Sequence, residues 1–63
     1  MFIRIEDKTQ LLAELEKTSE RVVVHYRCSD CSDEQVTYDY EANEVIERIS
    51  TEDRINAGYV EYE

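Results

Sequence analysis

The sequence lacks proline and tryptophan, and it has only one glycine, one histidine, one methionine and one phenylalanine in 63 residues. Because it contains no Pro-rich, Gly-rich or low-complexity stretch that could serve as a linker, we expect one domain over residues 1–63. No apolar run approaches the roughly 20 residues that span a bilayer, and the first residues show no apolar signal-peptide core. We therefore expect a cytoplasmic protein that does not bind membranes.

The motifs of several common active and binding sites are also missing. There is no Gly-rich phosphate loop, and the segment around Asp30 and Asp33 lacks the glycine and the terminal glutamate of an EF-hand. His25 is the only histidine, and no Ser or Cys nucleophile stands at a recognised spacing from it. A chain of this length can hardly enclose a substrate, so we expect a protein that is not an enzyme.

Basic residues are scarce as well. Seven Lys and Arg stand against sixteen Asp and Glu, which gives a formal net charge of −9. In so small a domain the carboxylates must lie close to the surface, where their field reaches about one Debye length, roughly 8 Å at physiological salt. Such a field repels nucleic acid and attracts basic proteins. We expect no direct binding of nucleic acid.

The two cysteines, Cys28 and Cys31, form a single CxxC motif. A structural zinc ion takes four ligands, so this motif supplies half of a site. Further ligands would have to come from His25, Asp30 or Asp33, or from the same motif of another subunit. Three interpretations remain open for the motif: reduced thiols beside a turn, a disulfide formed on oxidation, and a weak zinc site. No other cofactor is expected.

Four segments have clear periodic patterns. Ile3 and Ile5 alternate with polar residues, which predicts a short strand, and Asp7 then forms an N-cap for a helix over residues 8–18. The β-branched and aromatic residues of 21–28 predict a strand that buries one face. The alternation in 35–41 predicts a further strand, antiparallel to the strand over 21–28.

The remainder of the sequence is harder to interpret. Residues 41–44 resemble a hairpin turn, and the β-branched content of 45–49 favours a strand, although the apolar spacing there also fits a helix. Residues 56–58, which include the single glycine, predict a turn before a last short strand over 59–62.

These elements add up to an α+β fold in the order β-α-β-β-β-β. The expected architecture is a small antiparallel sheet of about four to five strands, with one helix packed on one face. A domain of about 60 residues has a small core, and this sheet would have open edges and an uncovered face. A homodimer that pairs edge strands or uncovered faces would enlarge the core, so we expect a homodimer.

The function that this composition favours is binding through carboxylates. An ordered acidic surface can occupy the DNA-binding site of a basic protein, because duplex DNA presents about one phosphate charge per 1.7 Å of its axis. We expect a non-enzymatic inhibitor that mimics DNA and blocks a nucleoid protein, polymerase, nuclease or repair enzyme. In size and charge alone, the chain is similar to small acidic inhibitors encoded by phages and mobile elements.

Two groups of residues are the candidates for this surface. The acidic candidates are Glu14, Glu16, Asp30, Asp33, Glu34, Asp39, Glu41, Glu44, Glu47, Glu52 and Asp53. The aromatic candidates, chosen because rigid aromatic side chains anchor protein interfaces, are Tyr38, Tyr40, Tyr59 and Tyr62. The alternative function is a small structural or interaction module whose Cys28 and Cys31 contribute to a zinc site or to dimerisation.

Overall fold

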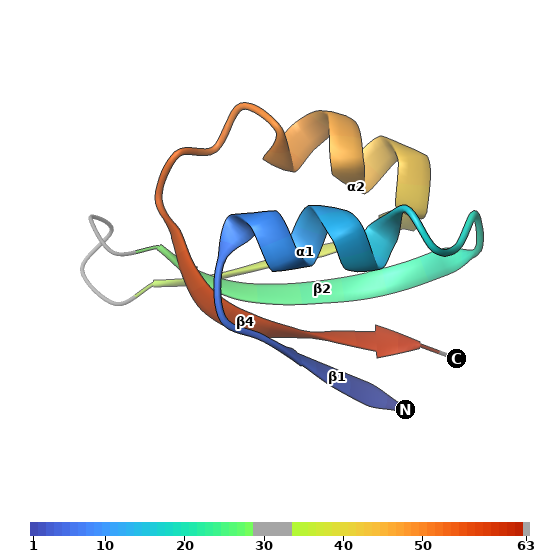
Figure 1. The fold of residues 1–63 in the computed structure, drawn as a ribbon, viewed down its shortest axis with the longest axis horizontal. Coiled ribbons are helices and arrows are strands. Elements are labelled where there is room, and N and C mark those ends of the chain that lie inside the picture. Colours follow the sequence, from blue (N-terminus) through green and yellow to red (C-terminus); the bar gives the residue numbers. More distant parts are fainter. Residues whose placement is uncertain (29–33, 63) are drawn as a thin grey trace.

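Four strands form one antiparallel sheet in the computed structural model, which describes residues 1–28 and 34–62 (Figure 1). The strands are β1 (Phe2–Ile5), β2 (Arg21–Cys28), β3 (Gln35–Glu41) and β4 (Ile55–Tyr62). Their order across the sheet is β1-β4-β2-β3, and each neighbouring pair is antiparallel. The predicted pairing of 21–28 with 35–41 is therefore confirmed, and β1 and β3 are the two edge strands.

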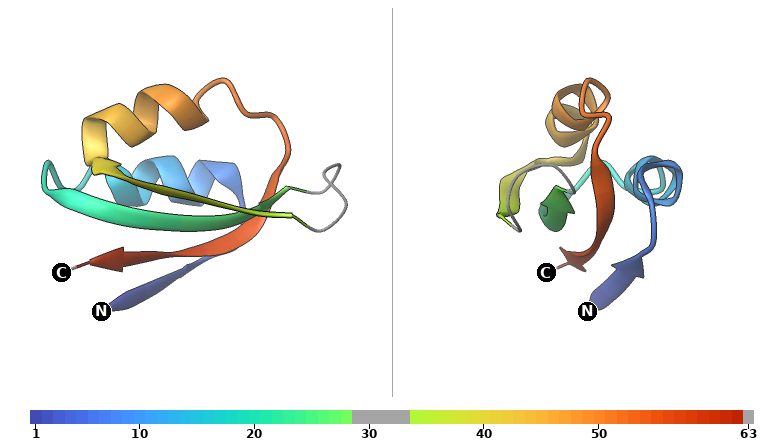
Figure 2. Two further views of the ribbon diagram at one scale, coloured as in Figure 1. Left: turned by 180° about the vertical axis from the view of Figure 1, so that it is seen from behind. Right: turned by 90° about the vertical axis from the view of Figure 1, so that its left-hand side faces the viewer.

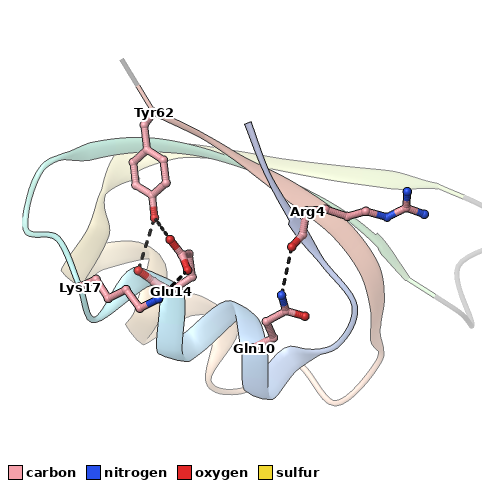
Figure 3. Close-up of polar contacts among 5 residues, drawn as sticks. All are labelled: Arg4, Gln10, Glu14, Lys17 and Tyr62. Carbon is pink, nitrogen blue, oxygen red and sulfur yellow. Dashed lines mark hydrogen bonds and ion pairs between the residues drawn. The ribbon is translucent and has the colours of Figure 1, made fainter. Parts of the chain in front are cut away.

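Two helices, α1 (Lys8–Leu15) and α2 (Ala42–Ile49), cover the same face of the sheet (Figure 2). The predicted cap of α1 is confirmed, because Asp7 Oδ1 accepts a hydrogen bond of 2.9 Å from the Gln10 backbone N–H. The Gln10 side chain also donates to the Arg4 carbonyl oxygen at 3.1 Å, which ties the start of the helix to β1 (Figure 3). The helix ends at Leu15, three residues earlier than predicted.

The core lies between the helices and the sheet. Alternate residues of β2 point into it, as the sequence predicts: Val22, Val24 and Tyr26 are buried. Their cross-strand neighbours and the inner faces of both helices complete it, and these further buried side chains include Ile5, Leu11, Leu15, Ala42, Val45, Ile49, Ile55 and Val60. No helix of the described segments, 1–28 and 34–62, lies on the opposite face of the sheet (Figure 2).

The predicted strand over 45–49, with its hairpin turn at 41–44, is wrong: this segment is the helix α2. Ala42, Val45 and Ile49 are fully buried at helical spacing, with Ile46 packed against the same core. A strand would have placed Val45 and Ile49 on one face and Ile46 on the other, whereas a helix brings all of them onto the sheet. Burial of this stripe outweighs the β-propensity of single residues.

The predicted turn at 56–58 is also wrong, because β4 runs unbroken from Ile55 to Tyr62. Gly58 lies opposite Tyr26 of β2, beside an irregularity in the strand register at Arg27 and Cys28. A Cβ atom at position 58 would overlap the His25 carbonyl oxygen and lie 2.6 Å from the Tyr26 Cα. The glycine thus permits a close approach of the two central strands, and it makes no turn.

Candidate functional site

The predicted acidic residues are spread over several parts of the molecule. Asp30 and Asp33 lie outside the described residues. The exposed members are Glu16, Glu34, Asp39, Glu41, Glu44, Glu47 and Asp53, whereas Glu14 and Glu52 are half-buried. They do not form one continuous strip, and only some of them lie close together.

One group of acidic residues comes together where β3 leads directly into α2. An open groove of about 530 Å³ is lined by Tyr40, Glu44, Glu47, Arg48 and Thr51. A second hollow of about 270 Å³ adjoins it, and the two share Tyr40 and Glu44. We call Tyr40, Glu41, Glu44 and Glu47 the β3–α2 surface.

The carboxylates of the β3–α2 surface are electrostatically unbalanced. Within the described part of the chain, Glu41, Glu44 and Glu47 form no ion pair. The nearby cation Arg48 instead lies over an aromatic ring, with its guanidinium carbon 4.3 Å from the centroid of Tyr40. Glu44 and Glu47 lie one turn apart on α2, and Glu41 is the last residue of β3. Regular secondary structure therefore fixes the backbone positions of the three glutamates.

Asp39 is different, since Arg21 neutralises it. Arg21 Nε and Nη2 donate to the two carboxylate oxygens of Asp39 at 2.8 and 2.9 Å, a bidentate pair between neighbouring strands. These hydrogen bonds and the positive charge of Arg21 lower the pKa of Asp39 below its ordinary value. Asp39 therefore contributes less to the external field than the three glutamates.

Glu14 and Tyr62 belong to an internal contact that joins α1 to β4 (Figure 3). The Tyr62 hydroxyl donates to Glu14 Oε1 at 3.1 Å, and Lys17 Nζ lies 3.1 Å from Glu14 Oε2. Burial and the bond to Glu14 raise the pKa of Tyr62 to about 12. Glu14 and Tyr62, both candidates from the sequence, thus contact each other between α1 and β4 and lie apart from the β3–α2 surface.

The four predicted tyrosines do not form one cluster. Tyr38 and Tyr40 are on the helix side of β3, and Tyr38 packs against the core. Tyr59 lies on the opposite face, where its ring stacks on His25 with 4.4 Å between the centroids. Tyr40 alone belongs to the β3–α2 surface, and 37% of it is exposed.

Cys28 is buried at the end of β2 and is disulfide-bonded, and Cys31 lies outside the described residues. Cysteine binds zinc as a thiolate, so Cys28 could bind metal only after reduction of that bond. Within residues 1–28 and 34–62, no group of three or more His, Cys, Asp or Glu side chains is placed to hold a metal ion.

Two residues of the groove, Arg48 and Thr51, were not among the sequence candidates. Arg48 follows Glu44 at the helical i, i+4 spacing, so interpreting 42–49 as a helix would have placed them on one face. The spacing of Glu44 and Arg48 therefore indicated a shared helical face, but this could not be recognised once 45–49 had been predicted as a strand.

No protein-family model, curated protein or solved structure matches this chain. Among the described residues, neither helix has the length and apolar character needed to cross a membrane.

Proposed function

We propose that this protein is a non-enzymatic inhibitor that binds a basic DNA-binding protein through its β3–α2 surface and competes there with DNA. The observation that carries the proposal is the set of three carboxylates, Glu41, Glu44 and Glu47, which have no ion pair in the described chain and stand beside an exposed tyrosine. Lys and Arg side chains that neutralise phosphates can pair with such carboxylates instead.

Rigidity supports this proposal. Glu44 and Glu47 lie on a helix whose inner face is buried, and Glu41 is the last residue of a strand paired along its length with β2. The backbone of these three residues is therefore already ordered before binding, whereas an acidic disordered tail would lose conformational entropy when it binds. The adjoining grooves are open, which suits the flat surface of a protein better than an enclosed small substrate.

The net charge adds a long-range contribution to the same interaction. A charge of −9 steers a basic partner toward the protein and makes association fast and sensitive to salt. The β3–α2 surface would then determine where the partner binds. Total charge and local arrangement can be separated by experiment, because the chain offers exposed carboxylates elsewhere.

The test is a pull-down from nuclease-treated lysate with three tagged proteins of confirmed fold. The first is the natural chain and the second carries E41Q, E44Q and E47Q. The third is a control with E6Q, E16Q and E34Q, which are exposed positions outside the β3–α2 surface. Both variants have the same formal charge of −6 (the natural −9 less three carboxylates).

We expect the natural chain and the control to retain one basic DNA-binding protein that duplex DNA releases, and the β3–α2 variant to lose it. Equal loss in both variants would show that total charge alone acts. A partner that is neutral, or that DNA fails to displace, would refute DNA mimicry.

A further inference from the structure

The face of the sheet opposite the helices has an unusual composition for so acidic a chain. Among the described residues no helix covers it (Figure 2). We call it the open sheet face, and its members by strand register are Phe2, Arg4, Arg21, Val23, His25, Arg27, Gln35, Thr37, Asp39, Glu41, Ala57, Tyr59 and Glu61. Three arginines and three carboxylates give it a formal charge of zero, against −9 for the whole chain.

Aromatic rings occupy the centre of this face. The Tyr59 ring stacks on His25 and meets Phe2 edge-on, with 5.5 Å between the ring centroids of Phe2 and Tyr59. His25 Nδ1 lies 3.2 Å from Thr37 Oγ1, so the row extends across to the other edge strand. Phe2 is 67% exposed although it is the only phenylalanine of the chain. None of the helices and strands that the structure describes forms a layer over this row.

We infer that the open sheet face is the surface through which two copies of this chain pair. A two-fold dimer places the same surface on both sides of its interface. Any net charge on that surface therefore faces an equal charge of the same sign and is repelled by it. Pairing through the β3–α2 surface would bring six unpaired glutamates together, whereas pairing through the open sheet face opposes two nearly neutral surfaces. The two surfaces share only Glu41, and this inference does not depend on the proposed function.

The area of the face sets the expected strength of the dimer. The sheet contains 27 strand residues, which at about 3.3 Å along and about 4.8 Å between strands cover roughly 430 Å² per subunit. Two such faces bury roughly 860 Å², which is below the approximately 1,000 Å² that stable specific interfaces exceed. We therefore expect a weak dimer of the transient kind that such small interfaces form.

Salt should strengthen this dimer. Two bodies of charge −9 whose centres are about 20 Å apart repel each other enough to weaken association about ten-fold at 0.15 M salt. At 0.5 M salt the repulsion is largely screened, and apolar contacts are unaffected or stronger. The dimer should thus tighten about ten-fold, while binding of a basic partner should weaken over the same range.

Sedimentation equilibrium from 1 to 500 μM at both salt concentrations measures this directly, with 7.5 kDa expected for the monomer and twice that for the dimer. The variant F2E replaces the exposed Phe2 ring of the open sheet face by a carboxylate and should abolish the dimer at 500 μM. The matched control A13E adds the same charge at an exposed position of α1 and should dimerise like the natural chain.

A second measurement locates the contact. Concentration-dependent amide shifts in ¹⁵N spectra should be confined to residues of the open sheet face, such as His25, Thr37 and Tyr59. A monomer at 500 μM, a dimer that F2E leaves intact, or species that grow beyond two subunits would each overturn the inference. Binding of a labelled oligo-dT to the same residues in place of self-association would also overturn it, since aromatic and arginine side chains can stack on bases.

Discussion

Replacement of Tyr62 by Phe should produce a loss of stability that disappears in alkali. The Tyr62 hydroxyl is half-buried and donates to Glu14 Oε1, so it joins β4 to α1 (Figure 3). Hydrogen bonds to charged groups contribute about 1.5–3 kcal/mol when buried. Because Tyr62 is only partly buried, we expect Y62F to lower the free energy of unfolding by about 1 kcal/mol at pH 7.

The pKa of the same group predicts how this difference changes with pH. In the folded protein the pKa of Tyr62 is about 12, against an ordinary value of 10, so above pH 10 the unfolded chain releases the proton first. The stabilisation by the neutral phenol is therefore complete below pH 10 and is lost as the pH rises toward 12. A difference of two between the folded and unfolded pKa values corresponds to a stabilisation of at most about 2.7 kcal/mol. Partial exposure of Tyr62 reduces this stabilisation to about 1 kcal/mol.

Urea unfolding followed by circular dichroism at pH 7, 9 and 11 tests this, at a protein concentration low enough to keep the chain monomeric. The natural protein should exceed Y62F in free energy of unfolding by about 1 kcal/mol at pH 7 and 9, and by about half as much at pH 11. The control Y59F removes a hydroxyl that makes no hydrogen bond within the described residues, and should change stability by less than about 0.5 kcal/mol. A difference between natural protein and Y62F that is constant over pH would refute the reasoning.

Three further changes should alter stability, and thermal or urea unfolding measures each. G58A forces a Cβ into the backbone of β2 and should cost about 3 kcal/mol; full stability would contradict the close strand approach. D7A removes the N-cap of α1 and should cost about 1 kcal/mol, whereas D7N should retain most of it. I49A, at a fully buried position, should cost about 3 kcal/mol and clearly more than I46A, and equal effects would argue against the orientation of α2.

Much of the fold could be predicted because several segments have one buried face and a clear boundary. Asp7 marks the start of α1, and alternation in 21–28 identifies the buried side of β2. Residues 45–49 were misassigned because Val and Ile favour strands locally, while the helical stripe acquires its value only from packing on the sheet. Gly58 was taken for a turn because a close approach of two strands depends on a partner more than thirty residues away.

The candidate site could be predicted only in composition. The sequence shows many carboxylates, but which of them remain unpaired depends on tertiary contacts such as Glu14 with Tyr62, 48 residues apart. Likewise, Glu41, Glu44 and Glu47 come together because a helix follows β3 directly. Charge can thus be counted from a sequence, whereas its distribution over a surface requires the fold.

The position of β3 at the edge of the sheet has a consequence for the solubility of the protein. An edge strand exposes backbone N–H and C=O groups that can recruit strands from other molecules, which is the first step of fibril growth. Near its C-terminal end this edge carries Asp39, which is paired with Arg21, and Glu41, which forms no ion pair with any residue that the structure describes. Two such edges in contact would bring like charges together, so the acidic residues at this edge also protect the protein from aggregation.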